Sequence, residues 1–225
     1  MNYLVKLFPN LVGNMDRLIA AIGETLIMVF VSGTISIFFG LGLGIVLVIT
    51  RQGGILENKY INLGLEKIIS IFRSIPFIIL LAALLPVSRL LVGTGIGTRA
   101  ALFPLVVAGI PFLGKQIESA LLEVDQGLIE AAESMGSGPL EIIVRVYLRE
   151  AIKGIIRGIS ISLISLIGLS AVAGNIGGGG LGDFAIRYGY GKSQHDITYG
   201  TILILMILVL LIQKIANILI KKFNY

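Results

Sequence analysis

Residues 25–50 of this chain read TLIMVFVSGTISIFFGLGLGIVLVIT and contain no Asp, Glu, Lys or Arg. A helix needs about 20 predominantly apolar residues to cross the hydrocarbon core of a bilayer, so this stretch is long enough. The rest of the chain has the same character, since 56% of its 225 residues are hydrophobic, 14% are charged and its mean hydropathy is +0.96. Water-soluble domains of this size rarely have such a composition. The sequence therefore predicts an integral membrane protein.

Four further apolar stretches follow the first one. The predicted spans are 25–50, 68–92, 100–113, 155–173 and 197–220. The third is short, and extending it through residues 114–122 would admit Lys115 and Glu118 near its end. We expect an all-α polytopic membrane protein with five transmembrane helices, forming a single domain over residues 1–225.

The distribution of basic residues predicts the orientation, because Lys and Arg accumulate in cytoplasmic loops. With the amino terminus outside and the carboxyl terminus in the cytoplasm, 12 of the 18 Lys and Arg residues lie on the cytoplasmic side. The outer side then holds Lys6, Arg17, Arg89, Arg99, Arg187 and Lys192. The basic residues lie in short segments between apolar runs and do not form one face, so we expect no binding to nucleic acid.

Small residues recur at four-residue spacing in the first span, at Ser36, Gly40 and Gly44. They share one stripe of a helix, which would let a second backbone approach closely. The alternative is the general enrichment of glycine in membrane helices. We expect the stripe to mark a helix contact.

Residues 127–153 differ from the apolar runs around them and predict a helix, a turn and a second helix. Gly136 can take the positive φ that closes the first helix, and Pro139 suits the first turn of the second. One side of the second helix is predicted to carry its apolar residues, which are Leu140, Ile143, Val144, Tyr147, Ala151 and Ile155. The other side carries the charged residues Glu141, Arg145, Arg149 and Lys153, among which Glu141 and Arg145 can pair at i,i+4.

Glu130-Ala131-Ala132, followed by Gly136 and by Val146-x-Leu148, resembles the EAA signature of ABC importer permeases. The resemblance implies a short coupling helix that sits in a groove of an ATPase subunit. Its coupling residues would be Leu128, Glu130, Ala131, Ala132 and Gly136. One position departs from the signature, because Arg149 stands where the family usually has proline. The alternative is an amphipathic surface helix that contains Glu-Ala-Ala by chance.

Further segments resemble the permease subunit of the bacterial methionine importer family. They are IFRSIPFIILL at residues 71–81, ALLE at 120–123, GGGLG at 178–182 and YGY at 188–190. The resemblance extends over roughly residues 20–220. It implies a type I importer fold in the bacterial inner membrane, with two copies of this chain, two ATP-binding subunits and an extracytoplasmic methionine-binding lipoprotein.

No enzyme site is expected on this chain. It has no Cys and a single His, His195, so neither a thiolate nor a multi-histidine metal site can form. Gly177-x-Gly179-x-x-Gly182 matches a dinucleotide pattern, but it follows a span instead of a strand, so we interpret it as a flexible outer loop. Gly191-Lys192-Ser193 lacks the earlier glycine of a phosphate loop. We expect no cofactor here, with ATP and Mg²⁺ bound by the partner ATPase.

The expected function is to form the pathway for methionine, both D and L, across the membrane. Pathway candidates are Arg73, Ser74, Pro76, Ser170 and Asn175. Arg73 could instead anchor a helix end at the interface, and the serines could serve ordinary helix hydrogen bonds. Alternative functions are a permease for another neutral or polar amino acid, an ion-coupled carrier or channel acting without ATP, or a membrane scaffold. An ion-coupled carrier usually needs an ionisable group near mid-membrane, and no Asp or Glu lies inside the predicted spans.

Overall fold

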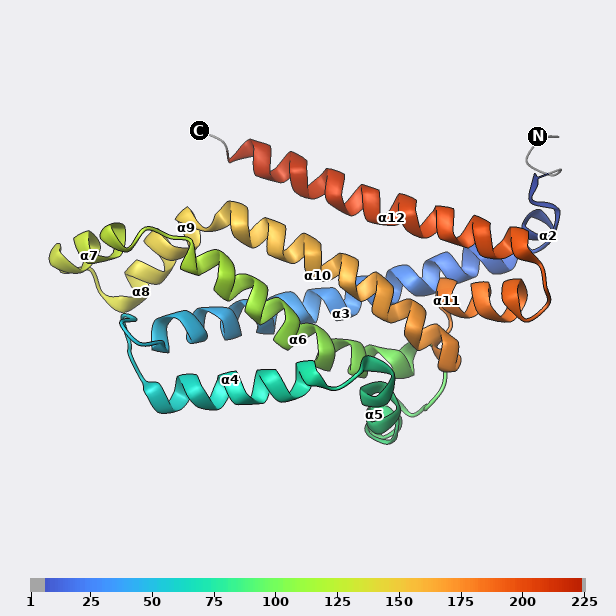
Figure 1. Cartoon of the computed structure of the whole chain (residues 1–225), viewed down its shortest axis with the longest axis horizontal. Helices are drawn as coiled ribbons and strands as arrows, with labels where there is room; N and C mark the ends of the chain where they lie inside the picture. Colours follow the sequence, from blue (N-terminus) through green and yellow to red (C-terminus); the bar gives the residue numbers. More distant parts are fainter. Residues whose placement is uncertain (1–6, 224–225) are drawn as a thin grey trace. The chain divides into compact units, whose positions relative to one another are not determined.

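The computed structural model describes residues 7–223, and every element in this part of the chain is helical (Figure 1). Lys6, assigned above to the outer side, lies outside these residues. The elements are α2 (Pro9–Gly13), α3 (Met15–Thr50), α4 (Lys59–Ser74), α5 (Phe77–Val92), α6 (Thr98–Leu122), α7 (Gln126–Ser134), α8 (Pro139–Ile142), η1 (Ile143–Tyr147), α9 (Leu148–Glu150), α10 (Ile152–Ala173), η2 (Gly174–Gly178), α11 (Gly180–Phe184), η3 (Ala185–Tyr190) and α12 (His195–Lys222). The three elements labelled η are π-helical turns.

Four helical segments are long and apolar enough to cross a membrane, namely α3, α6, α10 with η2, and α12. A fifth span results if α4 and α5 are taken together as one broken span. The first segment begins ten residues before the predicted span, and its 36 residues would rise about 54 Å at 1.5 Å each. This length exceeds the hydrocarbon thickness of about 30 Å, so part of α3 must extend beyond it.

The stretch 68–92, expected as one span, contains two helices. α4 ends at Ser74, and α5 begins at Phe77. Between them Ile75 is extended, with φ −80° and ψ 123°. The ring of Pro76 explains this conformation, because proline disfavours a helical residue before it and has no N–H to donate.

The third predicted span, 100–113, belongs to a longer helix, α6. The alternative boundary at residue 122 matches the observed end at Leu122. The charges that discouraged this extension are paired, because the Lys115 ammonium lies 2.9 Å from Glu66 of α4 and 2.5 Å from Glu118. Pairing offsets the cost of partly burying these groups, so the helix can continue through them.

The described residues divide into two compact units, whose boundaries fall inside α3, α6, α10 and α12 and between α4 and α5. The first unit contains residues 7–34, Pro76–Val107 and Leu163–Gln213. One of its two apolar clusters is built on Met28, Leu81, Leu105 and Leu166, and the other on Leu18, Leu181, Phe184 and Ile197. The second cluster includes side chains of α11, which belongs to the glycine-rich segment.

The second unit contains Ile35–Ile75, Ala108–Ser162 and 214–223. Its core holds Leu113 and Ile117 of α6, together with Ile129 of α7 and Tyr147 of η1. The small-residue stripe of α3 packs here, because a Cβ atom on Gly44 would lie 2.6 Å from Ile117 Cβ. The predicted role of the stripe as a helix contact is therefore confirmed.

The glycine-rich segment was interpreted above as a flexible outer loop, and this interpretation is wrong. Residues 174–190 form η2, α11 and η3, and Gly174, Gly178, Gly180 and Gly182 are buried. A Cβ atom on Gly182 would lie 2.2 Å from the carbonyl oxygen of Ala171. The glycines therefore let two backbones touch, a requirement that composition alone does not distinguish from flexibility.

Candidate functional site

The segment that resembles a coupling helix is α7, and its ends are defined by capping. Asp125 accepts a hydrogen bond from the backbone N–H of Gly127 at 2.7 Å, which caps the first turn. At the other end Gly136 has φ +83°. Gly136 N–H donates to Glu133 O, and Ser137 N–H donates to Ala132 O. This pair of bonds is a Schellman motif, so the predicted helix-closing role of Gly136 is confirmed.

α7 has one buried face and one exposed face. Ile129 and Ala132 are 2% and 5% exposed and belong to the core of the second unit. The exposed positions Leu128, Ala131 and Met135 follow at three- and four-residue spacing and therefore share a second face, which lies beside the buried one. Apolar side chains on an exposed helix face indicate a surface that contacts another molecule.

The remaining candidates on α7 divide in the same way. Glu130 and Gly136 are exposed, while Ala132 packs inward. Of the five residues that the family resemblance implied, four therefore remain available to a partner. Ala132 instead supports the helix from beneath, where a larger side chain would separate α7 from its core.

The second helix of the loop buries only part of the predicted face. Tyr147, Ala151 and Ile155 are buried as predicted, but at its start Ile142 is buried instead, whereas Leu140 is 75% exposed and Val144 is 54% exposed. The cause is the π-helical turn η1, which adds one residue to a turn and so places position i+5 where i+4 would otherwise fall. The α-helical spacing used for the prediction therefore identified the buried residues from Tyr147 onward and failed on the residues before it.

Beyond this turn the chain continues as helix to Glu150 and changes direction at Ala151, where ψ is 0°. Ala151 N–H still donates to Tyr147 O, and α10 begins at Ile152. Arg149, which replaces the proline of the signature, is exposed on this short helical stretch. The predicted pair of Glu141 and Arg145 is confirmed, at 2.5 Å.

Tyr147 is the buried titratable group of this loop. Burial raises the pKa of its phenol, the positive charge of Arg51 lowers that pKa, and the negative charge of Glu133 raises it. Because the net shift is upward from an already high value, Tyr147 stays neutral at physiological pH and acts as a core residue.

The pathway candidates do not form one described site. Arg73 and Ser74 end α4 in the second unit, while Pro76, Ser170 and Asn175 belong to the first. Arg73, Ser74 and Asn175 are exposed. The hydroxyls of Ser74 and Ser170 donate to carbonyls of their own helices, Ile71 O at 2.8 Å and Ile167 O at 2.7 Å. This geometry fits the ordinary helix hydrogen bonds named above as the alternative.

Glu24 and Thr25 of α3 were not identified from the sequence. The Glu24 carboxylate accepts from Gly180 N–H at 2.6 Å, and the Thr25 hydroxyl accepts from Leu181 N–H at 2.8 Å. These bonds satisfy the first N–H groups of α11, which have no backbone acceptor within the helix. The sequence did carry a signal, because Glu24 is an acidic residue directly beside an apolar span. The predicted span began at residue 25, so Glu24 was not considered.

Comparison with known proteins agrees with this arrangement of helices. The family described as binding-protein-dependent transport system inner membrane component matches residues 36–224. The probable D-methionine transport system permease protein MetI of Vibrio cholerae serotype O1 is 45% identical over 212 residues, 94% of each chain. The corresponding Escherichia coli K12 protein is 45% identical over 157 residues, 70% of this chain and 72% of that one.

A solved structure of inward-facing conformations of the MetNI methionine ABC transporter also matches. The TM-score is 0.92 at 41% identity, over 95% of this chain and 99% of the other. The expected fold class, an all-helical polytopic membrane protein, is thereby confirmed.

These observations define a multi-pass transport permease, the membrane component of an ABC transporter and not itself the ATPase. The chain belongs to the family of binding-protein-dependent transport system inner membrane components, and within it to the methionine permeases.

Proposed function

We propose that this chain forms the translocation pathway of an ATP-driven importer for D- and L-methionine. The observation that carries the proposal is α7, whose Schellman motif holds Leu128, Ala131 and Met135 on an exposed face. Identity of 45% to a probable D-methionine permease over 94% of the chain supports the choice of substrate.

The working complex contains two copies of this chain, two ATP-binding subunits and an extracytoplasmic methionine-binding lipoprotein. The amino terminus lies outside, which places α7 in the cytoplasm beside the ATPase. ATP and Mg²⁺ bind the ATPase subunits. Apolar contacts from Leu128 and Met135, together with the charge of Glu130, transmit closure of the ATPase pair to the membrane helices.

Transport is tested in proteoliposomes that contain the complete complex, with binding protein outside and ATP inside. We expect ATP-dependent accumulation of radiolabelled methionine, and no ATP hydrolysis by the isolated chain. A non-hydrolysable ATP analogue is the control. Accumulation driven by an ion gradient without ATP, or accumulation of an unrelated solute in place of methionine, would contradict the proposal.

A further inference from the structure

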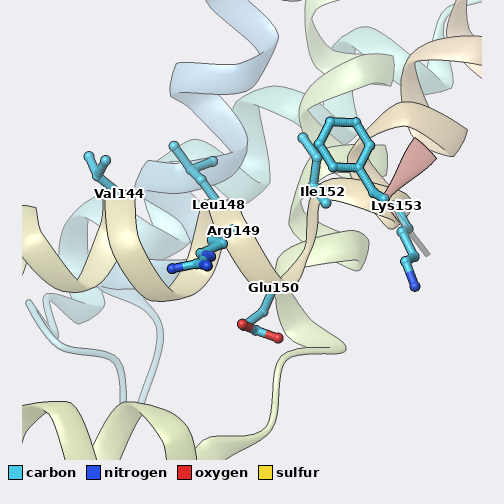
Figure 2. A pocket seen from close by; sticks show the side chains of 7 residues that line it. Val144, Leu148, Arg149, Glu150, Ile152 and Lys153 are labelled. Carbon is cyan, nitrogen blue, oxygen red and sulfur yellow. The ribbon is translucent and has the colours of Figure 1, made fainter. Parts of the chain in front are cut away.

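A hollow of about 680 Å³ lies in the second unit, at the point where the loop meets α10. Figure 2 shows the labelled side chains around it, which come from consecutive turns of η1, α9 and α10. Among residues 7–223 its lining consists of Val144, Leu148, Arg149, Glu150, Ile152, Lys153 and Phe223. A hollow of this volume can take a small-molecule ligand or the head of a lipid.

The position of the hollow relative to the membrane follows from the ends of two spans. One segment that can cross a membrane begins at Ile152, and another ends at Lys222, next to Phe223. Both ends border the hollow and lie within three residues of the apolar stretches 155–173 and 197–220, so we place the hollow next to the head-group region. This placement depends only on which residues can span, and it holds for either orientation of the chain.

The lining combines apolar and cationic groups. Val144 is 54% exposed and Phe223 is 38% exposed, so both present apolar surface that no residue of the described chain covers fully. Arg149 and Lys153 stand four residues apart, and within residues 7–223 neither forms a salt bridge. With the carboxylate of Glu150, the formal net charge of the lining is +1.

We propose that this hollow binds one anionic glycerophospholipid of the surrounding bilayer. Arg149 holds the phosphodiester through two parallel N–H donors, and Lys153 adds a second positive charge. The acyl chains lie against the apolar side chains of Ile152 and Phe223. The head group of phosphatidylglycerol carries a net charge of −1, which balances the net charge of the lining, whereas the head group of phosphatidylcholine has no net charge. Arg149 therefore acquires a role in place of the proline that the signature usually has there.

The bound lipid would hold the start of α10 at the membrane surface, directly after the loop that carries α7. The inference does not rest on the proposed transport function, because the hollow, its charges and the span ends are present whatever the chain transports. A failure of methionine transport would leave it standing.

Lipid binding is measured by native mass spectrometry of the full chain in detergent, titrated with phosphatidylglycerol or phosphatidylcholine. We expect phosphatidylglycerol to bind more tightly. The double variant Arg149→Gln/Lys153→Gln should lower this affinity about 25-fold, since each cation near a membrane surface contributes about 5-fold. Arg145→Gln is the matched control, because this exposed arginine of the same loop does not line the hollow.

Glu150→Gln provides a test in the opposite direction. Removal of the carboxylate should raise the affinity for phosphatidylglycerol. If the double variant does not fold, this variant alone tests whether the charges of the hollow control lipid binding. Equal binding of the two lipids, equal loss in the Arg145→Gln control, or unchanged affinity in the test variants would overturn the proposal. Displacement of the lipid by equimolar sn-glycerol phosphate would also overturn it, in favour of a soluble phosphate ligand.

Discussion

Gly136 and Gly182 show two opposite uses of glycine in one molecule. A Cβ atom on Gly136 would meet no atom within 4 Å, but the residue has φ +83°. Glycine is therefore required at this position because of the backbone conformation. Gly182 is buried within α11, and its Cβ would lie 2.2 Å from Ala171 O, so its glycine is required for space. The first requirement is local, whereas the second depends on a neighbouring segment of the fold.

The largest effect is expected from Gly182→Val. The new side chain would overlap backbone atoms that cannot rotate away, and we expect a loss of about 3 kcal/mol or more of unfolding free energy. Thermal unfolding of the full chain in detergent, followed by circular dichroism, measures this. Gly168→Ala in α10 is the control, because nothing lies within 4 Å of its Cβ position. Equal melting temperatures for the two variants would show that the glycine-rich segment tolerates side chains.

A smaller effect is expected from Thr25→Val, which keeps the shape of the side chain but removes the acceptor for Leu181 N–H. An unsatisfied buried donor costs about 2 kcal/mol, so the melting temperature should fall. Thr34→Val on the same helix is the control, since the Thr34 hydroxyl is exposed and bonds only Phe30 O. If both variants unfold at the same temperature, the link between α3 and α11 does not stabilise the segment.

Gly136→Val should affect stability less and coupling more. A β-branched residue at positive φ costs about 1–2 kcal/mol locally, but it meets no neighbour, so membrane insertion and folding should survive. We expect a loss of the ATPase stimulation by methionine and binding protein in the reconstituted complex. Gly136→Asn should lose less, since asparagine tolerates this conformation better. Full ATPase stimulation in the valine variant would show that the glycine cap of α7 is not needed for coupling.

Glu130→Lys should change stability least, within about 0.5 kcal/mol, because Glu130 is exposed. Its effect should appear in coupling, where a reversed charge meets the ATPase surface. The measurement is again the stimulated ATPase activity, and Glu130→Gln should fall between the wild type and Glu130→Lys. If Glu130→Lys couples normally, this face of α7 does not contact the ATPase.

The sequence by itself determined the membrane class, four of the long helices, and both ends of the turn between α7 and α8. These features depend on composition along one segment or on capping within a few residues, so they can be predicted without knowledge of the fold. Gly136, Pro139 and the pair of Glu141 and Arg145 belong to this group.

Only the tertiary structure decided the features that depend on contacts between distant segments. Pairing of Lys115 with Glu66 accompanies the continuation of α6 to Leu122, and the π-turn η1 brings Ile142 onto the same buried face as Tyr147. Residues 174–190 are ordered because their glycines touch other backbone and because Glu24 and Thr25 supply acceptors from α3. Such partners are far away in the sequence, so no local pattern can distinguish a buried glycine from a flexible one.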